Sequence, residues 1–254
     1  MEIKHAALVI VDISGYTNFL RYRNLSLLHA EDIITQLLES VIDAAEFPLI
    51  LNKLEGDAAF LYALMDGDHA RAAQDILQQV LAFFPAFHRK AAELSQDTAQ
   101  CDCDACTQID RLKLKAFLHH GEVVVKRIRQ FEELAGDNVI LIHRLLKNTV
   151  STDEYILMTK SFSELTEGIS GFKKEGRIEN YKNIGKTEID VFYPQKGIAP
   201  LKVTPSVTRK FSRSISRTQR LISHITGISR INKFRYIPNR KISLLGILKD
   251  MFGL

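Results

Sequence analysis

Residues 6–15 of the chain read AALVIVDISG. The six apolar residues of this stretch, Ala6–Val11, are consecutive and rich in branched side chains, which is typical of a strand buried on both faces. Asp12 ends the apolar run, and Ser14 and Gly15 follow it with backbone N–H groups suited to phosphate oxygens. Because ligands of open α/β sheets usually bind at the carboxyl ends of strands, the stretch predicts a central strand that leads into a binding site.

Apolar periodicity extends the prediction to the rest of the sheet. The predicted elements are helices at residues 26–47, 68–94 and 138–147, hairpins at residues 49–63 and 112–128, and further strands within residues 155–193. The first hairpin is expected to turn at Glu55-Gly56, and the second around the sequence His119–Glu122. The order β, α, ββ, α, ββ, α, β predicts an α+β fold of the ferredoxin-like, palm type, which is an antiparallel sheet with helices packed on one face.

Composition divides the chain into two parts. With 254 residues, 46% hydrophobic and 25% charged, it has the composition of an ordinary globular protein, which excludes disorder throughout. Residues 201–254 carry 12 Lys or Arg against the single Asp250, whereas the remainder carries 22 basic and 29 acidic residues. Three prolines, Pro194, Pro200 and Pro205, interrupt regular structure near this change. We therefore predict an acidic domain at residues 1–195 and a basic, partly amphipathic C-terminal segment at residues 196–254.

The sequence also bears on location and partners. No apolar run approaches the roughly 18 residues of a membrane span, and the cysteines are too crowded for a disulfide framework, so a cytoplasmic protein is expected. The basic C-terminal segment is a candidate for an anionic membrane surface or an acidic partner, with packing on the domain as the alternative. Sequence-specific recognition of nucleic acid is disfavoured, because few aromatic residues lie among the basic ones.

Two carboxylates are candidates for a metal site. Asp12 follows the central strand, and Asp57 follows the expected turn of the first hairpin. If that hairpin lies beside the central strand, both carboxylates meet at one end of the sheet, where two hard oxygen ligands suit Mg²⁺ or Mn²⁺ together with triphosphate oxygens. The alternative is that Asp12 caps the following helix and Asp57 is a turn residue.

Four stretches carry a resemblance to a known family. They are Val11–Thr17 (VDISGYT), Lys53–Ala58 (KLEGDA), His119–Val124 (HHGEVV) and Gly136–Leu145 (GDNVILIHRL). Together they resemble a divergent bacterial branch of the class III adenylate and guanylate cyclases. The first is similar to the family pattern Asp-Ile-x-Gly-Phe-Thr, the second to Lys-x-x-Gly-Asp-Ala and the fourth to Gly-Asp-x-Val-Asn-x-Ala-x-Arg-Leu. The likeness spans about residues 5–193.

The resemblance implies an activity and a metal site. Cyclases of this family convert a nucleoside triphosphate to a 3′,5′-cyclic nucleotide and pyrophosphate. By resemblance, Asp12 and Asp57 bind two Mg²⁺ or Mn²⁺ ions with the Ile13 carbonyl as a further ligand. The backbone of Ile13, Ser14, Gly15, Tyr16 and Thr17 is then expected to lie against the phosphates.

The resemblance also assigns the residues that meet the base and the transition state. Lys53 and Glu133 match the purine-reading pair and favour ATP over GTP. Arg144 matches the arginine that stabilises transition-state charge, and Lys186 lies near the phosphate-binding lysine. Ile140 stands where the family has a ribose-binding asparagine, and losing one such contact can cost on the order of 10² to 10³ in rate. A catalytically degenerate nucleotide-binding module is therefore the alternative. For Arg144 and Lys186 the alternatives are a surface salt bridge and an exposed turn.

A homodimer is expected on two grounds. The family works as a head-to-tail homodimer in which one chain supplies the metal ligands and the other reads the base. If Glu55-Gly56 is the turn, Leu54 opposes Asp57, and strand alternation directs Lys53 and Asp57 to opposite faces. One chain would then be unable to use both in one site.

The cysteines suggest a second metal site. Cys101, Cys103 and Cys106 are closely spaced, and three thiolates with one further ligand, such as His119 or His120, would satisfy tetrahedral zinc. Ordinary thiols or a redox switch are the alternatives.

Overall fold

The structure is a computed structural model that describes residues 1–16, 19, 24–97, 106 and 108–194. The chain divides into units Met1–Leu201 and Lys202–Leu254, and the second lies outside the described residues. The boundary at residue 195 therefore stays a prediction. Within the described part of the chain, no helix combines the length and the apolar character needed to cross a membrane.

The central strand is β1 (Glu2–Ser14), and it confirms the prediction made from the apolar run. Side chains Ala6–Val11 are completely buried. β1 pairs antiparallel with β3 on one side and with β4 on the other, so its backbone hydrogen bonds are satisfied along both edges.

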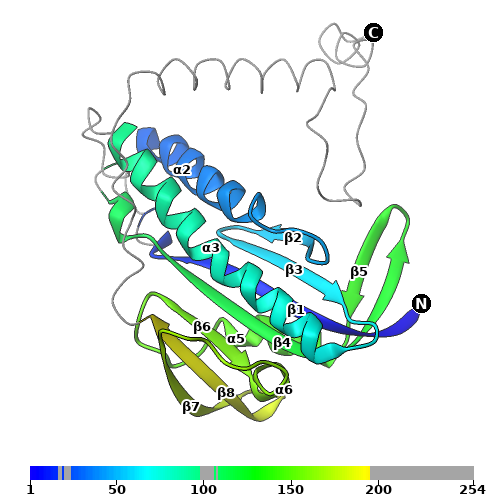
Figure 1. Cartoon of the computed structure of the whole chain (residues 1–254). Coiled ribbons are helices and arrows are strands. Elements are labelled where there is room, and N and C mark those ends of the chain that lie inside the picture. The colour runs from blue at the N-terminus through cyan, green and yellow to red at the C-terminus, as the bar shows by residue number, and fades with distance from the viewer. Residues whose placement is uncertain (17–18, 20–23, 98–105, 107, 195–254) are drawn as a thin grey trace, which may run out of the picture. The chain divides into compact units, whose positions relative to one another are not determined.

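The sheet is mixed, with antiparallel pairs in the majority (Figure 1). The other strands are β2 (Ile50–Glu55), β3 (Ala58–Leu64), β4 (Lys113–Ile128), β5 (Phe131–Ala135), β6 (Tyr155–Thr159), β7 (Phe172–Tyr181) and β8 (Gly185–Pro194). Their order is β2-β3-β1-β4-β6-β8-β7, and β5 pairs with the far end of β4. β4 and β6 run parallel. The α+β architecture predicted from the sequence is confirmed.

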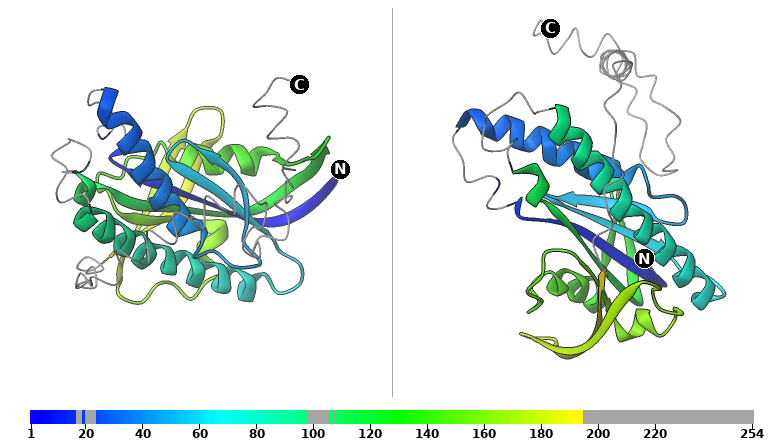
Figure 2. Two further views of the ribbon diagram at one scale, coloured as in Figure 1. Left: turned by 90° about the horizontal axis from the view of Figure 1, so that it is seen from above. Right: turned by 60° about the vertical axis from the view of Figure 1, so that its left-hand side comes forward.

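Helices lie on both faces of this sheet, whereas the sequence predicted them on one face (Figure 2). The helical elements are α2 (Asn24–Ile42), α3 (His69–Asp97), α5 (Asp137–Leu145), α6 (Lys160–Ser163) and the 3₁₀ turn η1 (Ile109–Arg111). The long helices α2 and α3 pack together on one face, as predicted. α5 lies on the other face, where Ile142 and Leu145 join a core cluster with Leu8 and Ile10 of β1. We call this second face the α5 face and the first the α3 face.

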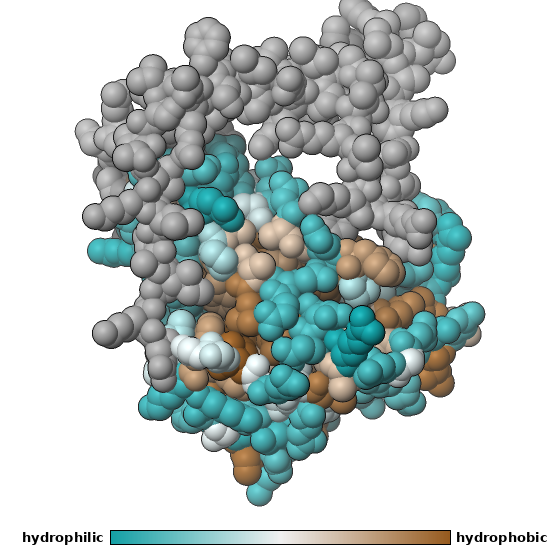
Figure 3. All heavy atoms as spheres, in the orientation of Figure 1, coloured by the Kyte–Doolittle hydropathy of each residue, from teal (hydrophilic) through white to brown (hydrophobic). Residues whose placement is uncertain are grey.

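The outer side of the long helices is largely hydrophilic. In the view of Figure 3, teal side chains predominate, with smaller brown patches of apolar residues between them. The amphipathic pattern predicted for α2 and α3 is confirmed by burial, because apolar residues such as Ile34 and Leu37 of α2 and Ile76 and Val80 of α3 are buried.

The turn of the second hairpin was predicted at the wrong position. Residues 113–128 form one continuous strand, β4, and the hairpin turns later, between β4 and β5, where Arg129 adopts a φ of 57°. Gly121 lies in the middle of β4 for another reason. A Cβ built on it would come within 2.4 Å of the Asn138 side chain. The glycine makes room for α5 and does not bend the chain.

The first predicted hairpin is correct, but its register is not. Glu55 pairs with Ala58, so Gly56-Asp57 is the turn and Asp57 lies in it. Lys53 pairs with Phe60, and Phe60 pairs with Ile10, which places Lys53 on the α5 face together with Asp12. The prediction that Lys53 and Asp57 point to opposite faces is therefore withdrawn, and with it the pleating argument for a dimer.

Candidate functional site

The structure brings Asp12 and Asp57 together at the end of β1. The Ile13 N–H donates a hydrogen bond of 3.2 Å to the Asp57 carbonyl, which ties the hairpin turn to the central strand. Burial and the neighbouring Asp57 raise the pKa of Asp12 from 3.8 to about 6, while Lys115 opposes the rise. Burial also raises the pKa of Asp57. The two carboxylates thus share a partly buried position, in which an ionised Asp57 disfavours a second charge on Asp12.

Lys115 is a member of the site that sequence reasoning missed. It is the β4 partner of Asp12, and its positive charge acts on both aspartates. Its ammonium also lies 5.7 Å from the centre of the Tyr155 ring. Only the strand register reveals this lysine, because nothing in its local sequence distinguishes it from other alternating lysines of β4.

The loop after β1 supplies polar groups next to the carboxylates. Ser14 is buried, and its hydroxyl has no hydrogen-bond partner among the described residues. The Tyr16 hydroxyl donates to Glu31 of α2 at 2.9 Å. Burial and this bond raise the pKa of Tyr16 to about 12, so the phenol stays protonated. The Ile13 N–H is already used by Asp57, so phosphate contacts would fall to the groups that follow it. Thr17 lies outside the described residues.

These residues fit a divalent cation. Asp12 and Asp57 offer hard carboxylate oxygens of the kind that Mg²⁺ and Mn²⁺ prefer. Glu31 adds negative charge beside them, as its effect on Asp57 shows. Burial and the Asp57 charge together outweigh the opposing effect of Lys115, so the pKa of Asp12 stays above its ordinary value. A cation would relieve the repulsion, and the unpartnered Ser14 hydroxyl would be a further oxygen at the same end of the sheet.

A second polar network lies on the same face. The Lys53 ammonium pairs with the Glu55 carboxylate at 3.1 Å, and His143 Nε2 lies 3.2 Å from the same carboxylate. Burial alone would raise the pKa of Glu55, but the hydrogen bonds from Lys53 and His143 lower it overall. His143 is held edge-on against Phe60 and hydrogen bonds to the Val139 carbonyl. The network ties the Lys53 side chain, and with it the hairpin that carries Lys53 and Asp57, to His143 of α5.

Glu133 is not brought beside Lys53. It lies in β5 between Glu132, which hydrogen bonds to the Tyr62 hydroxyl, and Leu134, which is part of the α5-face core. Strand alternation directs Glu133 to the opposite face. Within one chain, the carboxylate that accompanies Lys53 is Glu55.

Arg144 and Lys186 are both exposed. Arg144 lies near the end of α5, one turn after Ile140, whose side chain is 51% exposed. Lys186 is the second residue of β8, at the end of the sheet away from Asp12. The row of paired residues through Asp12 and Lys115 meets β8 near Phe192, six residues further along. At about 3.3 Å per residue, this separates Lys186 from the level of Asp12 by about 20 Å.

An open hollow of about 600 Å³ borders the site without containing its carboxylates. It is lined by Asp110, Arg111, Lys113, Thr152, Asp153 and Glu154. Lys113 is the β4 partner of Ser14, so the hollow adjoins the loop after β1.

A buried network at the start of α5 was also missed. His119 lies between Thr159 Oγ1 and Asn138 Oδ1, each 2.8 Å from a ring nitrogen. The Asn138 amide donates to the Glu122 carbonyl across the space left by Gly121. Burial lowers the pKa of His119, so the neutral ring is favoured. The network positions α5, the helix that carries Arg144, on the sheet.

The cysteine cluster is described only at Cys106. Cys101 and Cys103 lie outside the described residues. Cys106 is buried, and its sulfur lies 3.7 Å from His29 Nδ1. The histidine at this cysteine is therefore His29, whereas both ring nitrogens of His119 are engaged elsewhere.

Sequence comparisons connect the chain to proteins without an assigned role. A family model described as a protein of unknown function (DUF2652) matches residues 34–155. An uncharacterized protein of Mycobacterium tuberculosis (strain ATCC 25618 / H37Rv) is 44% identical over 126 residues, which are 50% of this chain and 57% of that protein. The chain thus spans little more than half the length of this curated relative.

Structure comparisons identify the fold. The adenylyl cyclase CyaB from P. aeruginosa superposes with a TM-score of 0.55 at 15% identity, covering 79% of this chain and 98% of that one. The guanylate cyclase domain from Catenaria anguillulae in complex with GTP gives 0.52 at 14% identity, with 77% and 100% covered. The domain therefore has the fold of class III adenylyl and guanylyl cyclase catalytic domains, and the resemblance predicted from four motifs is supported at the level of the fold.

Proposed function

We propose that this protein is a nucleotide cyclase that converts a nucleoside triphosphate, ATP by preference, to a 3′,5′-cyclic nucleotide and pyrophosphate. The observation that carries the proposal is the convergence of Asp12 and Asp57 at the end of the central strand, where burial raises both pKa values and the Asp57 charge raises that of Asp12 further. The cyclase-like fold supports it.

The residues present suggest a division of labour. Asp12 and Asp57 would hold two Mg²⁺ or Mn²⁺ ions, with the Ile13 carbonyl as a further ligand. Such ions, when bound, ease loss of the proton from the attacking hydroxyl and offset charge on the departing phosphates. Ser14, Gly15 and Tyr16 would meet the phosphates. Lys115 would draw the anionic substrate to a site that otherwise carries acidic groups.

Two copies of the chain would complete the site. Lys186 lies about 20 Å along the sheet from the level of Asp12, too far for both to meet one substrate from the same chain. In a head-to-tail homodimer, Asp12 and Asp57 of one chain would face Arg144 and Lys186 of the other. Lys53 and Glu133 would read the purine. Within one chain, Glu133 lies on the other face of the sheet from Lys53.

A nucleotide-sensing module without turnover is the second candidate, and Ile140 favours it. An exposed isoleucine on α5 cannot donate the hydrogen bond that an asparagine would give to a ribose. In that role the domain keeps its metal and triphosphate and signals by binding. Residues 196–254 would then be the output segment toward an anionic membrane surface or an acidic partner in the cytoplasm. Zinc at Cys101, Cys103 and Cys106 would be an accessory to either role.

The experiment incubates the full chain with each of the four ribonucleoside triphosphates and Mn²⁺, and reads the products by mass spectrometry. We expect a cyclic nucleotide and pyrophosphate, with ATP turned over fastest. Asp12→Asn and Asp57→Asn should each lower the rate by at least about 100-fold. Asp66→Asn, which changes an exposed acid elsewhere, is the matched control.

Binding separates the two candidates. Mn²⁺-dependent binding of a triphosphate without any cyclic product would favour the sensing module. Neither binding nor product with any of the four nucleotides would overturn both.

A further inference from the structure

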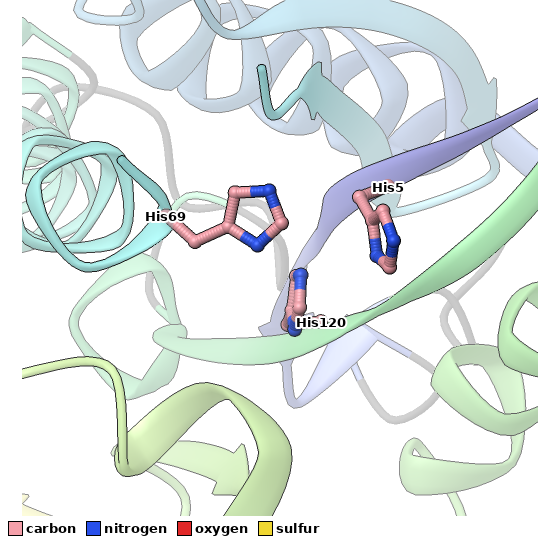
Figure 4. A group of neighbouring side chains, drawn as sticks. All are labelled: His5, His69 and His120. Carbon is pink, nitrogen blue, oxygen red and sulfur yellow. The ribbon is translucent and has the colours of Figure 1, made fainter. Parts of the chain in front are cut away.

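Three histidines from distant parts of the chain converge at the other end of β1. His5 belongs to β1, His69 is the first residue of α3 and His120 lies in the middle of β4. Each offers a ring nitrogen, and these three atoms all lie within 4.8 Å of one another. Figure 4 shows the three rings around a common space. Ring centres are 5.1 to 5.7 Å apart, and the rings are stacked, tilted or edge-on.

This cluster is separate from the carboxylate site. His5 precedes Asp12 by seven residues in one strand, which is about 23 Å of extended chain. His5 pairs with Glu122 and His120 pairs with Ala7, so these side chains lie on the α3 face. Asp12 lies on the α5 face. The two sites occupy opposite ends and opposite faces of the sheet.

The cluster contains a buried nitrogen that the protein does not satisfy. His120 Nε2 is buried and has no hydrogen-bond partner among the described residues. A buried polar atom without a partner costs about 1–3 kcal/mol, so it points to a group that the folded chain alone does not supply. The backbone around it is fixed, since the His120 carbonyl accepts a hydrogen bond from Ser161 and the His5 carbonyl accepts one from the Met65 N–H.

We propose that His5, His69 and His120 bind one divalent transition metal ion, Zn²⁺ foremost. Neutral imidazole nitrogens are ligands that suit zinc, and three of them occur in known zinc sites. At Zn–N lengths of about 2.0–2.1 Å, the ligand nitrogens of a tetrahedral ion stand about 3.3 Å apart. The three ring nitrogens lie at most 4.8 Å apart. Side-chain rotation that shortens the largest of these distances by about 1.5 Å gives the spacing that zinc requires.

Glu122 would be the fourth ligand once its side chain moves toward the ion, since the group of mutually close ligand atoms comprises the three histidines alone. Its carboxylate lies 3.6 Å from His5 Nε2 on the same face of the sheet. With Glu122 as the fourth ligand the site is closed, which is the arrangement of structural zinc sites. The ion would join side chains of β1, of β4 and of the first turn of α3, where β1 and β4 are already paired through their backbones.

The test measures metal in purified, metal-depleted full chain that carries Cys101→Ser, Cys103→Ser and Cys106→Ser. These substitutions remove the competing thiolate site, so bound metal reports the histidines. We expect one Zn²⁺ per chain by titration and elemental analysis. Co²⁺ should give the visible bands of a four-coordinate ion without sulfur-to-metal charge transfer. Zn²⁺ should also raise the melting temperature, because it binds only the folded chain.

Single substitutions locate the ion. His5→Gln, His69→Gln and His120→Gln should each weaken Zn²⁺ binding by more than about tenfold, since even the loss of a group that only supports a metal ligand costs 10–100-fold. His224→Gln, which removes an imidazole from the C-terminal segment, should leave the affinity unchanged. His5 is exposed, so its substitution keeps the test valid should His120→Gln fail to fold. Glu122→Gln should weaken binding as well, and an unchanged affinity removes Glu122 from the site.

Two results would overturn the proposal. One is less than about 0.1 Zn²⁺ per cysteine-free chain at concentrations that saturate ordinary zinc sites. The other is Zn²⁺ binding that survives all three histidine substitutions. Neither result bears on nucleotide turnover, so this inference and the proposed function stand or fall separately.

Discussion

Asp12 shows most directly how one residue reports on this fold. Its pKa of about 6, against an ordinary value of 3.8, means that the folded chain binds a proton more tightly than the unfolded chain. Stability from this group is therefore lost as the pH rises through about 6 and is regained as the pH falls toward 4. The difference corresponds to at most about 3 kcal/mol of destabilisation above pH 6 in the absence of a cation.

Asp12→Asn should consequently stabilise the metal-free protein at pH 7.5 by about 1–3 kcal/mol, since it removes a partly buried charge beside Asp57. The gain should shrink toward zero near pH 4, where the aspartate is protonated. Urea denaturation of the wild type, Asp12→Asn and the exposed-site control Asp66→Asn across this pH range measures it. Millimolar Mg²⁺ should reverse the order by stabilising the wild type alone. A destabilised Asp12→Asn protein at pH 7.5 would contradict the interpretation.

At the residue scale the sequence predicts part of the site. Asp12 and Asp57 could be found because Asp12 ends an apolar run shortly before Gly15, and Asp57 directly follows Gly56 at the predicted turn, which are local signals. Lys115 and Glu31 could not, because their charges reach the aspartates through strand pairing and helix packing. The same is true of His5, His69 and His120, which are far apart in the chain and meet only after the sheet and α3 have formed.

At the scale of elements, Gly121 explains the clearest error. The sequence around it, His119–Glu122, has the appearance of a turn, and glycine is a frequent turn residue. In the structure the glycine lies within a 16-residue strand and admits the Asn138 side chain of α5. A glycine required for a close approach and one required for a turn have the same local signature. The central strand and the two long helices were predictable because their apolar patterns are long and regular.

Gly121→Ala should therefore destabilise the domain by about 1–3 kcal/mol, since its Cβ would meet Asn138 at 2.4 Å in a packed region. Gly176→Ala in β7 is the matched control. Its Cβ would have its nearest neighbour at 3.6 Å, an ordinary contact, and should change stability little.

A double-variant cycle tests the cause of this destabilisation. The loss in free energy of unfolding for Gly121→Ala combined with Asn138→Ala should be less than the sum for the two single substitutions. The second substitution removes the side chain with which the new Cβ clashes. Chemical denaturation supplies the free energies of unfolding. Strict additivity would show that the strain has another origin.

At the scale of the whole molecule, the proposed cyclase requires two copies. Asp12 and Lys186 belong to opposite ends of one sheet, so a site that uses both is assembled between chains. Asp12→Asn and Lys186→Ala should each abolish turnover when measured alone. Mixed after reversible dissociation, they should recover about a quarter of wild-type activity, because half of the random dimers are mixed and each has one intact site.

Sedimentation provides the physical counterpart of this mixing experiment. The full chain with nucleotide and Mn²⁺ should sediment as a dimer. A monomer that turns over substrate would contradict a site shared between two chains. So would mixtures of Asp12→Asn and Lys186→Ala that recover no activity although mixed dimers form.

The hydrogen bond from the Ile13 N–H to the Asp57 carbonyl has a consequence for how a cation would be received. Two like charges on separate loops would move apart by repulsion, and an ion that binds would have to bring them back together. Here the main chain holds the hairpin tip against the central strand, so the backbone cannot move to separate the two carboxylates. An ion that enters finds its oxygens already in place and loses little of its attraction to reorganisation.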